Sequence, residues 1–313
     1  MRLLLAAALL LWASVSHAAP SVVVVLADDM RHDDIQYIPS LAAIAERGVN
    51  FTGALAPFPL CTPSRVSLLT GKRVESHGVV TNDIALADLS DTIATRVKQQ
   101  GWRTGYVGKF GNKMRALAEQ PPGWDSYSVL MKHSDYGSEQ AHVLARMGEE
   151  FLAGCHDTSC LLIVAPALPH GGPRGPKECG VSTVESPVDE HAARWRYRMR
   201  ALCGLDYLLR RVEAALPTDA TLVVTSDHGY IVADGKLGKN EQVLDAHRIP
   251  LVVARRGLAP ATRGEIVTPV DLATSIVAWA GGSTAGYEGR SIEPLLEGSN
   301  ERWINPVTLW SVP

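Results

Sequence analysis

The sequence of 313 residues lacks an excess of charge of either sign, and after residue 18 it lacks any long hydrophobic run. Its formal net charge is −3 at pH 7. A general nucleic-acid-binding protein presents clustered positive charge, so this balance argues against nucleic acid as a partner. A helix that spans a bilayer needs about 20 apolar residues in succession. No segment after residue 18 reaches that length, so we expect no membrane span.

Internal repeats and low-complexity linkers are also absent, so we expect one large core. Residues 1–18 have the pattern of a signal peptide, with Arg2 at the start, an apolar run at residues 3–13 and small residues before a cleavage site. The apolar run is too short for a membrane anchor. We therefore predict a signal peptide at residues 1–18 and one domain at residues 19–313. The protein would be secreted or periplasmic, or lysosomal in a eukaryote.

Cysteine is scarce, with five residues in the whole chain. Apart from Cys61, they are Cys155, Cys160, Cys179 and Cys203. Export permits disulfides, and four cysteines allow three pairings. Of these we favour a short Cys155–Cys160 loop together with a Cys179–Cys203 bridge.

Short apolar, β-branched segments alternate with helical segments along the chain. They predict strands buried on both faces of a sheet, at residues 21–27, 104–107, 161–165, 221–225 and 250–254. Gly or Pro near their ends marks helices at residues 41–47, 89–100, 190–216 and 270–280. Strands separated by helices indicate an α/β fold with a mostly parallel central sheet flanked by helices. Residues 169–187, rich in Gly and Pro, are interpreted as a loop over a functional site.

Cys61 opens the most distinctive segment, Cys61-Thr62-Pro63-Ser64-Arg65. Pro63 stiffens the turn, and Ser64 is a candidate N-cap for a helix just behind the cysteine. The thiol would then lie near a helix N-terminus, where backbone N–H groups favour an anion. Arg65 adds a cation suited to oxyanions. The pattern predicts a nucleophile or an anion cradle, and the alternative is a buried cysteine in a loop.

Two polar clusters follow predicted strands directly. Asp28 and Asp29 come after the first strand, and Asp227 and His228 follow the fourth, with one serine between. Adjacent carboxylates repel each other, and a divalent cation between them relieves the repulsion. Open α/β sheets bind ligands at the carboxyl ends of their strands. Either cluster alone is compatible with a solvated turn, but together they predict a metal site.

These motifs resemble those of the type I sulfatases, members of the alkaline phosphatase superfamily. Six motifs occur in the family's order over roughly residues 20–295. The resemblance implies a sulfatase-like catalytic domain at residues 19–313 with the family's α/β fold, in which the C-terminal subdomain is reduced or missing. It also implies hydrolysis of a sulfate ester, on a sulfated carbohydrate or another small sulfate ester.

The resemblance further implies a cofactor set. Formylglycine-generating machinery would oxidise Cys61 to formylglycine (3-oxoalanine), whose hydrated aldehyde is the family's nucleophile. One Ca²⁺ would be bound by residue 61 together with Asp28, Asp29, Asp227 and His228. His228 stands where many members of the family have Asn.

Catalytic roles are implied for further residues that match the family's motifs. Lys109 would contact the sulfate and the diol at residue 61, and Arg65 would meet charge on the sulfuryl oxygens. His170, in a Pro-His motif, and Lys239 would contact the sulfate ester, and one of them would give a proton to the departing alcohol. Lys236 lies near Lys239 and competes for its role.

One departure from the family's pattern follows Lys109. Most sulfatases have Lys-x-His there, whereas this chain reads Lys109-Phe110-Gly111-Asn112. That variant resembles the N-acetylglucosamine-6-sulfatase branch, and Asn112 would lie near the substrate.

Two other functions stay open at this stage. One is a phosphatase, phosphodiesterase or phosphonate hydrolase of the same superfamily. The other is a non-catalytic protein that binds acidic glycans on a sulfatase scaffold. The long predicted helix carries four arginines that form either a solvated face or a glycan contact, Arg194, Arg196, Arg198 and Arg200. The oligomeric state is left open.

Overall fold

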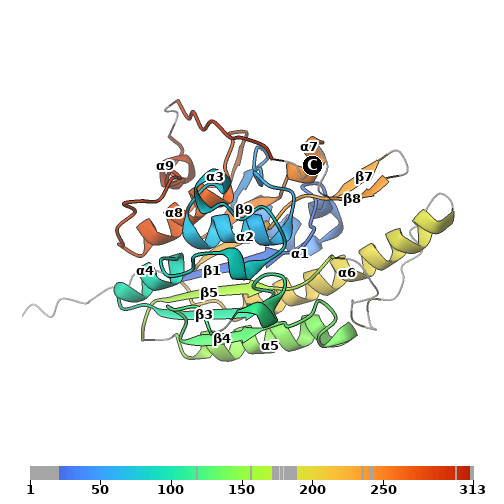
Figure 1. The fold of residues 1–313 in the computed structure, drawn as a ribbon, viewed down its shortest axis with the longest axis horizontal. Coiled ribbons are helices and arrows are strands. Elements are labelled where there is room, and N and C mark those ends of the chain that lie inside the picture. Colours follow the sequence, from blue (N-terminus) through green and yellow to red (C-terminus); the bar gives the residue numbers. More distant parts are fainter. Residues whose placement is uncertain are drawn as a thin grey trace, which may run out of the picture.

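A central sheet of eight strands organises the part of the chain that this computed structural model describes (Figure 1). That part comprises residues 21–117, 119–155, 157–170, 176, 179, 189–233, 236–239, 243–299 and 302–310. The signal peptide expected at residues 1–18 lies outside the described residues, as does most of the loop expected at residues 169–187.

The sheet has the strand order β10-β2-β9-β6-β1-β5-β3-β4. Its strands are β1 (Val22–Ala27), β2 (Val49–Phe51), β3 (Arg103–Gly108), β4 (Ser126–Val129), β5 (Cys160–Ala165), β6 (Thr221–Ser226), β9 (Leu251–Ala254) and β10 (Ala261–Arg263). The five strands from β6 to β4 pair in parallel, and β9 runs antiparallel to both β6 and β2. The mostly parallel sheet predicted from the sequence is therefore confirmed.

Strand β1 is buried along its whole length, and its successive side chains enter two different cores. Val22, Val24 and Leu26 join one core, whereas Val23 and Val25 join the other. This alternation follows from the two-residue period of a strand. A run of β-branched residues suits such a position because both faces of the sheet are covered.

Helices cover both faces of the sheet (Figure 1). One face carries α2 (Cys61–Thr70), α4 (Ile93–Gln99) and α8 (Pro269–Trp279), and the other carries α1 (Pro39–Arg47), α5 (Gln140–Ala153) and α6 (Asp189–Ala214). Short helices α3 (Val74–His77), α7 (Leu244–His247) and α9 (Glu293–Leu296) and a small hairpin of β7 (Ile231–Ala233) and β8 (Lys236–Gly238) lie at the periphery. None of the described helices has the length and apolar character needed to cross a bilayer.

The predicted strands all form, but two helix predictions were wrong in detail. The helix expected at residues 89–100 begins at Ile93, because Thr92 caps it in a reciprocal capping box with Thr95. The helix behind Cys61 begins at Cys61 itself, after extended Leu60, so Ser64 is not its N-cap. The Ser64 hydroxyl instead donates to the backbone carbonyl of Asp227. Helix α5 and the strands β2, β4 and β10 were not among the predicted elements.

Both favoured disulfides form. Cys155 bonds Cys160 across a five-residue separation, and Cys179 bonds Cys203 on α6. Cys61 is the free cysteine, and it is buried.

Candidate active site

Two neighbouring parallel strands bring the acidic clusters together. Strands β1 and β6 pair in register, with Ala27 opposite Ser226. The residues that follow them, Asp28-Asp29 and Asp227-His228, therefore lie at the same edge of the sheet. All four are buried, at 0 to 2% exposure. This is the edge at which open α/β sheets bind ligands.

Asp29 has a backbone conformation that aims its carboxylate at the second cluster. Its φ is 67°, in the left-handed region that non-glycine residues rarely adopt. Its backbone N–H donates to Asp227 Oδ1 at 3.2 Å, and its carbonyl accepts from Arg198 Nη2 at 3.0 Å. The turn is thus fixed by contacts to two distant segments, which offset a cost of about 1–3 kcal/mol for such a conformation.

Cys61 lies against this group at the first turn of α2. Its Sγ is 3.5 Å from Asp28 Oδ1, 3.3 Å from His228 Nε2 and 3.2 Å from Lys239 Nζ. Every residue of α2 is buried, so the helix holds Cys61 firmly at the end of the sheet. The N-terminal N–H groups of α2 favour negative charge at this point.

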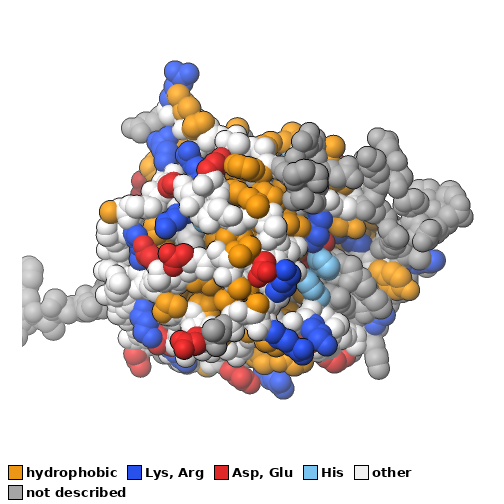
Figure 2. Space-filling model, viewed as in Figure 1, with side chains coloured by type: hydrophobic (Ala, Val, Ile, Leu, Met, Phe, Trp, Pro, Cys, Tyr) orange, Lys and Arg blue, Asp and Glu red, His pale blue; other side chains and the backbone are white. Residues whose placement is uncertain are grey.

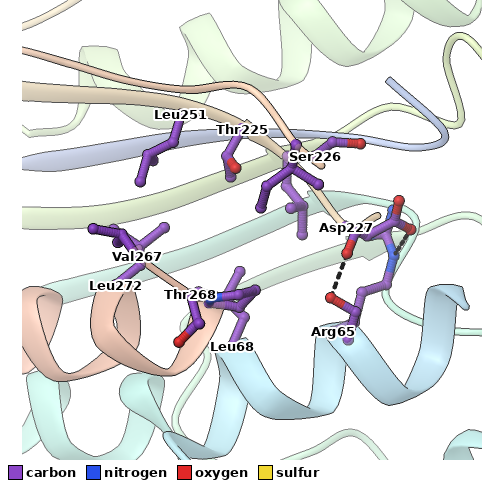
Figure 3. A pocket seen from close by; sticks show the side chains of 13 residues that line it. Arg65, Leu68, Thr225, Ser226, Asp227, Leu251, Val267, Thr268 and Leu272 are labelled. Carbon is purple, nitrogen blue, oxygen red and sulfur yellow. Dashed lines mark hydrogen bonds and ion pairs between the residues drawn. The ribbon is translucent and has the colours of Figure 1, made fainter. Parts of the chain in front are cut away.

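Each of three carboxylates in the site pairs with its own cation. Arg65 Nε bonds Asp227 Oδ2 at 2.9 Å (Figure 3), Lys109 Nζ bonds Asp28 Oδ2 at 2.6 Å, and Lys239 Nζ bonds Asp29 Oδ1 at 2.8 Å. Three carboxylates and three cations thus form pairs around Cys61, and His228 adds a further positive charge when it is protonated. Any divalent cation bound here leaves an excess of positive charge, which would attract an anion.

These pairings shift the pKa values of the carboxyl groups. Burial raises the pKa of Asp28, but the charges of Lys109, His170, Arg65 and Lys239 outweigh it and hold the pKa well below its usual value. The pKa of Asp29 is lowered in the same way, against burial, mainly by Lys239 and His228. Both carboxylates are therefore ionised at neutral pH, as a metal ligand must be.

The basic partners shift in the opposite direction. Burial lowers the pKa of His228, but Asp227 and the other negative groups around it outweigh burial and raise that pKa to about 9. The Nδ1 of His228 lies 2.8 Å from the carbonyl of Gly229, which leaves Nε2 facing the carboxylates. The pKa of Lys239 is also raised, against burial, by Asp29 in the first place. Lys239 therefore keeps its proton at neutral pH.

Two histidines line the open side of the site. His170 Nε2 is 3.9 Å from Asp29 Oδ2, and His133 Nε2 is 3.7 Å from Asp28 Oδ2. Their rings stack, with centroids 4.4 Å apart and an interplanar angle of 15°. Burial lowers the pKa of His170 despite the nearby carboxylates. Figure 2 shows histidine side chains at this surface with Lys and Arg side chains close by.

The donor atoms suit a divalent metal ion. One atom from each of Asp28, Cys61, Asp227 and His228 lies within 4.8 Å of the others, and all four residues are buried. Asp29 is not in this group of four, but its Oδ1 lies 3.3 Å from His228 Nε2. Three carboxylates form the oxygen-rich set that Ca²⁺ prefers. An imidazole nitrogen is a less usual ligand for Ca²⁺, so the case for this ion depends on the carboxylates.

A small cavity lies beside the Arg65–Asp227 pair (Figure 3). Its volume of about 10 Å³ is room for one water molecule, and its walls include Arg65, Leu68, Thr225, Asp227 and Leu272. Most of the wall is apolar, so the Arg65–Asp227 pair is shielded from solvent. Shielding of this kind strengthens the pair and fixes the direction of the guanidinium.

The structure brings most of the predicted site residues together. Eight of them surround one point, namely Asp28, Asp29, Cys61, Arg65, Lys109, Asp227, His228 and Lys239. His170 lies at the rim of the site. Asn112 lies next to Thr62, the neighbour of Cys61, and its Oδ1 accepts from the Thr62 hydroxyl at 3.2 Å. The side chain of Lys236 lies outside the described residues. His133 was not among the predicted site residues, because the strand before it, β4, was not predicted from the sequence.

Arg198 was misread as part of a solvated or glycan-binding face. It is 7% exposed, pairs with buried Asp34 and lies 5.0 Å from the ring of Tyr230. Through its bond to the carbonyl of Asp29 it supports the turn that carries the acidic pair. The side chain of Arg194 lies outside the described residues, whereas Arg196 is exposed.

The sequence of the chain is similar to those of known sulfatases. The model of the family described as Sulfatase matches residues 20–283. The chain is 27% identical to an extracellular sulfatase SULF-1 homolog of Drosophila melanogaster, over 90% of this chain and 32% of that protein. It is 26% identical to the N-acetylglucosamine-6-sulfatase of Capra hircus, over 92% of this chain and 66% of that enzyme. The chain thus spans less than two thirds of the length of either relative.

A solved structure shares the fold. The phosphonate monoester hydrolase of Agrobacterium radiobacter superposes with a TM-score of 0.78 at 18% identity, covering 91% of this chain and 79% of that one.

Replacing Arg198 by methionine tests its role in stability. The change leaves the Asp34 carboxyl buried without its counter-charge, and we expect the free energy of unfolding to fall by about 3–5 kcal/mol. Urea unfolding measures the loss, and Arg196→Met, on the same helix but exposed, is the matched control. Equal small losses in both variants would show that Arg198 is not a structural anchor.

Metal binding should release a proton from His228. In the metal-free protein His228 is protonated below pH about 9, and an imidazole must be neutral to ligate a metal. Calcium titrations at pH 7 in buffers of different ionisation enthalpy should therefore report close to one proton released, and less above pH 9. His228→Asn should abolish the release. No release from the unaltered protein at pH 7 would exclude His228 as a ligand.

Proposed function

The chain belongs to the sulfatase family, and on this premise we propose that it is a sulfuric ester hydrolase. The observation that carries the proposal is the convergence of three carboxylates and three cations on Cys61 at one edge of the sheet. Such a pocket holds a metal on its acidic side and a tetrahedral anion on its basic side. We further propose that residues 19–313 form the catalytic domain, exported by the segment at residues 1–18.

The cofactors proposed are one Ca²⁺ and formylglycine derived from Cys61. Asp28, Asp29, Asp227 and His228 would hold the ion together with residue 61, and the ion would draw charge from the sulfate oxygens. Oxidation of Cys61 by formylglycine-generating machinery would supply a hydrated aldehyde as the nucleophile at sulfur. The thiol of Cys61 marks where that oxygen would stand, directly beside Asp28 and Lys239.

The protein's own cations would bind and orient the sulfate group. Lys109 is held in the site by Asp28, and Lys239 is held there by Asp29. Arg65 pairs with Asp227 and also donates to the carbonyl of Lys109 at 2.5 Å. It therefore fixes both the proposed metal ligand Asp227 and the backbone that carries the Lys109 ammonium. Because these charges are in place before substrate binds, they stabilise charge that develops on the sulfuryl oxygens.

Proton supply to the departing alcohol is best assigned to His170. The raised pKa of Lys239 makes its ammonium a poor proton donor. His170 lies at the open rim, and burial lowers its pKa, so its imidazolium is a stronger acid than the ammonium of Lys239. An acid works best when its pKa is near the operating pH, so His170 would donate to the ester oxygen while Lys239 stays charged. Asn112, beyond Thr62, would face the remainder of the substrate.

The substrate class proposed is a sulfated carbohydrate. The goat relative is named for activity on N-acetylglucosamine 6-sulfate, and the fruit-fly relative is named extracellular. An exported enzyme of this family would meet sulfated sugars outside the cell. Hydrolysis of a phosphonate or phosphate monoester is the second candidate, since the fold is shared with a phosphonate monoester hydrolase. The additional negative charge of a phosphate monoester would need more cations than this single-metal site offers.

Mass analysis and kinetics test the proposal together. The protein should be produced with formylglycine-generating enzyme, and the peptide that contains position 61 should carry an aldehyde. Such protein should hydrolyse an aryl sulfate faster than the matching aryl phosphate. Replacing Cys61 with alanine removes the nucleophile and should lower kcat/KM by at least about 10³-fold.

Arg196→Ala, an exposed change outside the set of site residues, is the control and should retain full activity. An aldehyde at position 61 without sulfate hydrolysis, or phosphate hydrolysis faster than sulfate hydrolysis, would contradict the proposed reaction. A thiol that persists in native material would favour a non-catalytic protein that binds acidic glycans.

A further inference from the structure

A pocket opens beside Lys109, on the side of the site away from the Asp227 cluster. Its volume is about 370 Å³, within the range of small-molecule sites. Its walls come from the segments after β3 and β4, namely Lys109, Gly111, Asn112, Lys113, Leu130, Met131, Lys132, His133 and Ser134. Because β3 and β4 are parallel neighbours, both segments lie at the same edge of the sheet as the nucleophile.

The pocket is continuous with the anion site through His133. This residue lines the pocket, and its ring stacks on His170 while its Nε2 lies 3.7 Å from Asp28 Oδ2. A sugar whose sulfate ester reaches residue 61 would therefore extend past His133 toward Lys113 and Lys132.

The charge of the pocket is positive and is not matched by its own walls. No Asp or Glu belongs to the lining residues, while three lysines do. The ammonium of Lys109 is taken up by Asp28, and that of Lys113 pairs with Asp83 at 2.9 Å at the exposed rim. Lys132 is exposed and forms no ion pair with any residue that the structure describes. Its charge is thus available to a ligand.

The walls are built by local hydrogen bonds. Asp135 Oδ2 accepts from the backbone N–H groups of Met131 at 2.7 Å and Lys132 at 2.9 Å, which closes a tight turn. The Gln140 side chain donates to the carbonyl of His133 at 3.1 Å and fixes the other end of that turn. On the facing wall Lys113 has φ 56°, a left-handed conformation that side chains rarely adopt. The backbone of Lys132 is thus held by its turn, and the carbonyl of Lys113 accepts from the backbone N–H of Ala116 at 2.8 Å.

We propose that this pocket is a second anion subsite, so that the substrate is a sulfated sugar with an additional sulfate or carboxylate group. The proposal rests on the proposed sulfatase function and adds a substrate preference to it. Lys132 is its cation, because Lys113 is already paired with Asp83. An ion pair between two partly exposed groups changes affinity only modestly and weakens with salt. We therefore expect the subsite to change the preference among substrates and not the rate of hydrolysis as such.

Kinetics on a substrate panel test the subsite. The panel holds a sugar monosulfate, the disulfates with the second sulfate at each other ring position, and a sulfated uronate. We expect the unaltered enzyme to prefer at least one doubly charged sugar. Lys132→Ala should lower the ratio of its kcat/KM to that of the monosulfate by about 5- to 10-fold, mainly through KM. If Lys132→Ala affects a disulfate, the second group is a sulfate, and if it affects the sulfated uronate, the second group is a carboxylate.

Lys98→Ala is the matched control, because Lys98 is an exposed lysine that pairs with Asp125 beside the first residues of β3 and β4. It should leave the ratio unchanged. Calorimetry of the same sugars with Cys61→Ala and Cys61→Ala/Lys132→Ala proteins measures the subsite without turnover. If no sulfate ester is hydrolysed, the proposed function fails and calorimetry alone decides the subsite. Equal ratios in all variants, or equal affinities with and without Lys132, would overturn the subsite.

Discussion

The whole site depends on one electrostatic arrangement, in which three buried carboxylates each face a buried or half-buried cation around Cys61. Three buried charges of one sign would repel strongly without these partners. The carboxylates and their partners come from five different segments, namely the turns after β1 and β6, helix α2, the end of β3, and the segment that carries Lys239. Correct placement of any one therefore depends on the complete fold, and the sheet order is what brings them together.

The arrangement also explains how the site can be stable without substrate and still bind an anion. In the protein alone, each carboxylate is neutralised by its paired cation, and protonated His228 adds one further positive charge. A divalent ion that takes the carboxylates as ligands leaves Arg65, Lys109 and Lys239 with excess positive charge, and Lys239 already contacts Cys61. Metal binding and anion binding would thus support each other, which is a coupling of two sites through shared charges.

Much of the site could be predicted from the sequence because its acidic residues follow long, apolar, β-branched strands. Val22–Ala27 and Thr221–Ser226 are strong strand signals, and parallel neighbours place their ends side by side. His133 was missed because it follows Ser126–Val129, a short edge strand with polar side chains. Arg198 was misread because its partner Asp34 lies 164 residues away, and no local pattern shows such a contact.

A crystal structure of the protein grown with calcium tests the central claim most directly. The account predicts one ion bound by oxygens of Asp28, Asp29 and Asp227 at about 2.3–2.6 Å, beside residue 61. It also predicts that Lys109 and Lys239 point toward residue 61 from the side opposite the ion. Carboxylates that keep only their Lys and Arg partners at saturating calcium, or an ion bound elsewhere on the chain, would contradict the account.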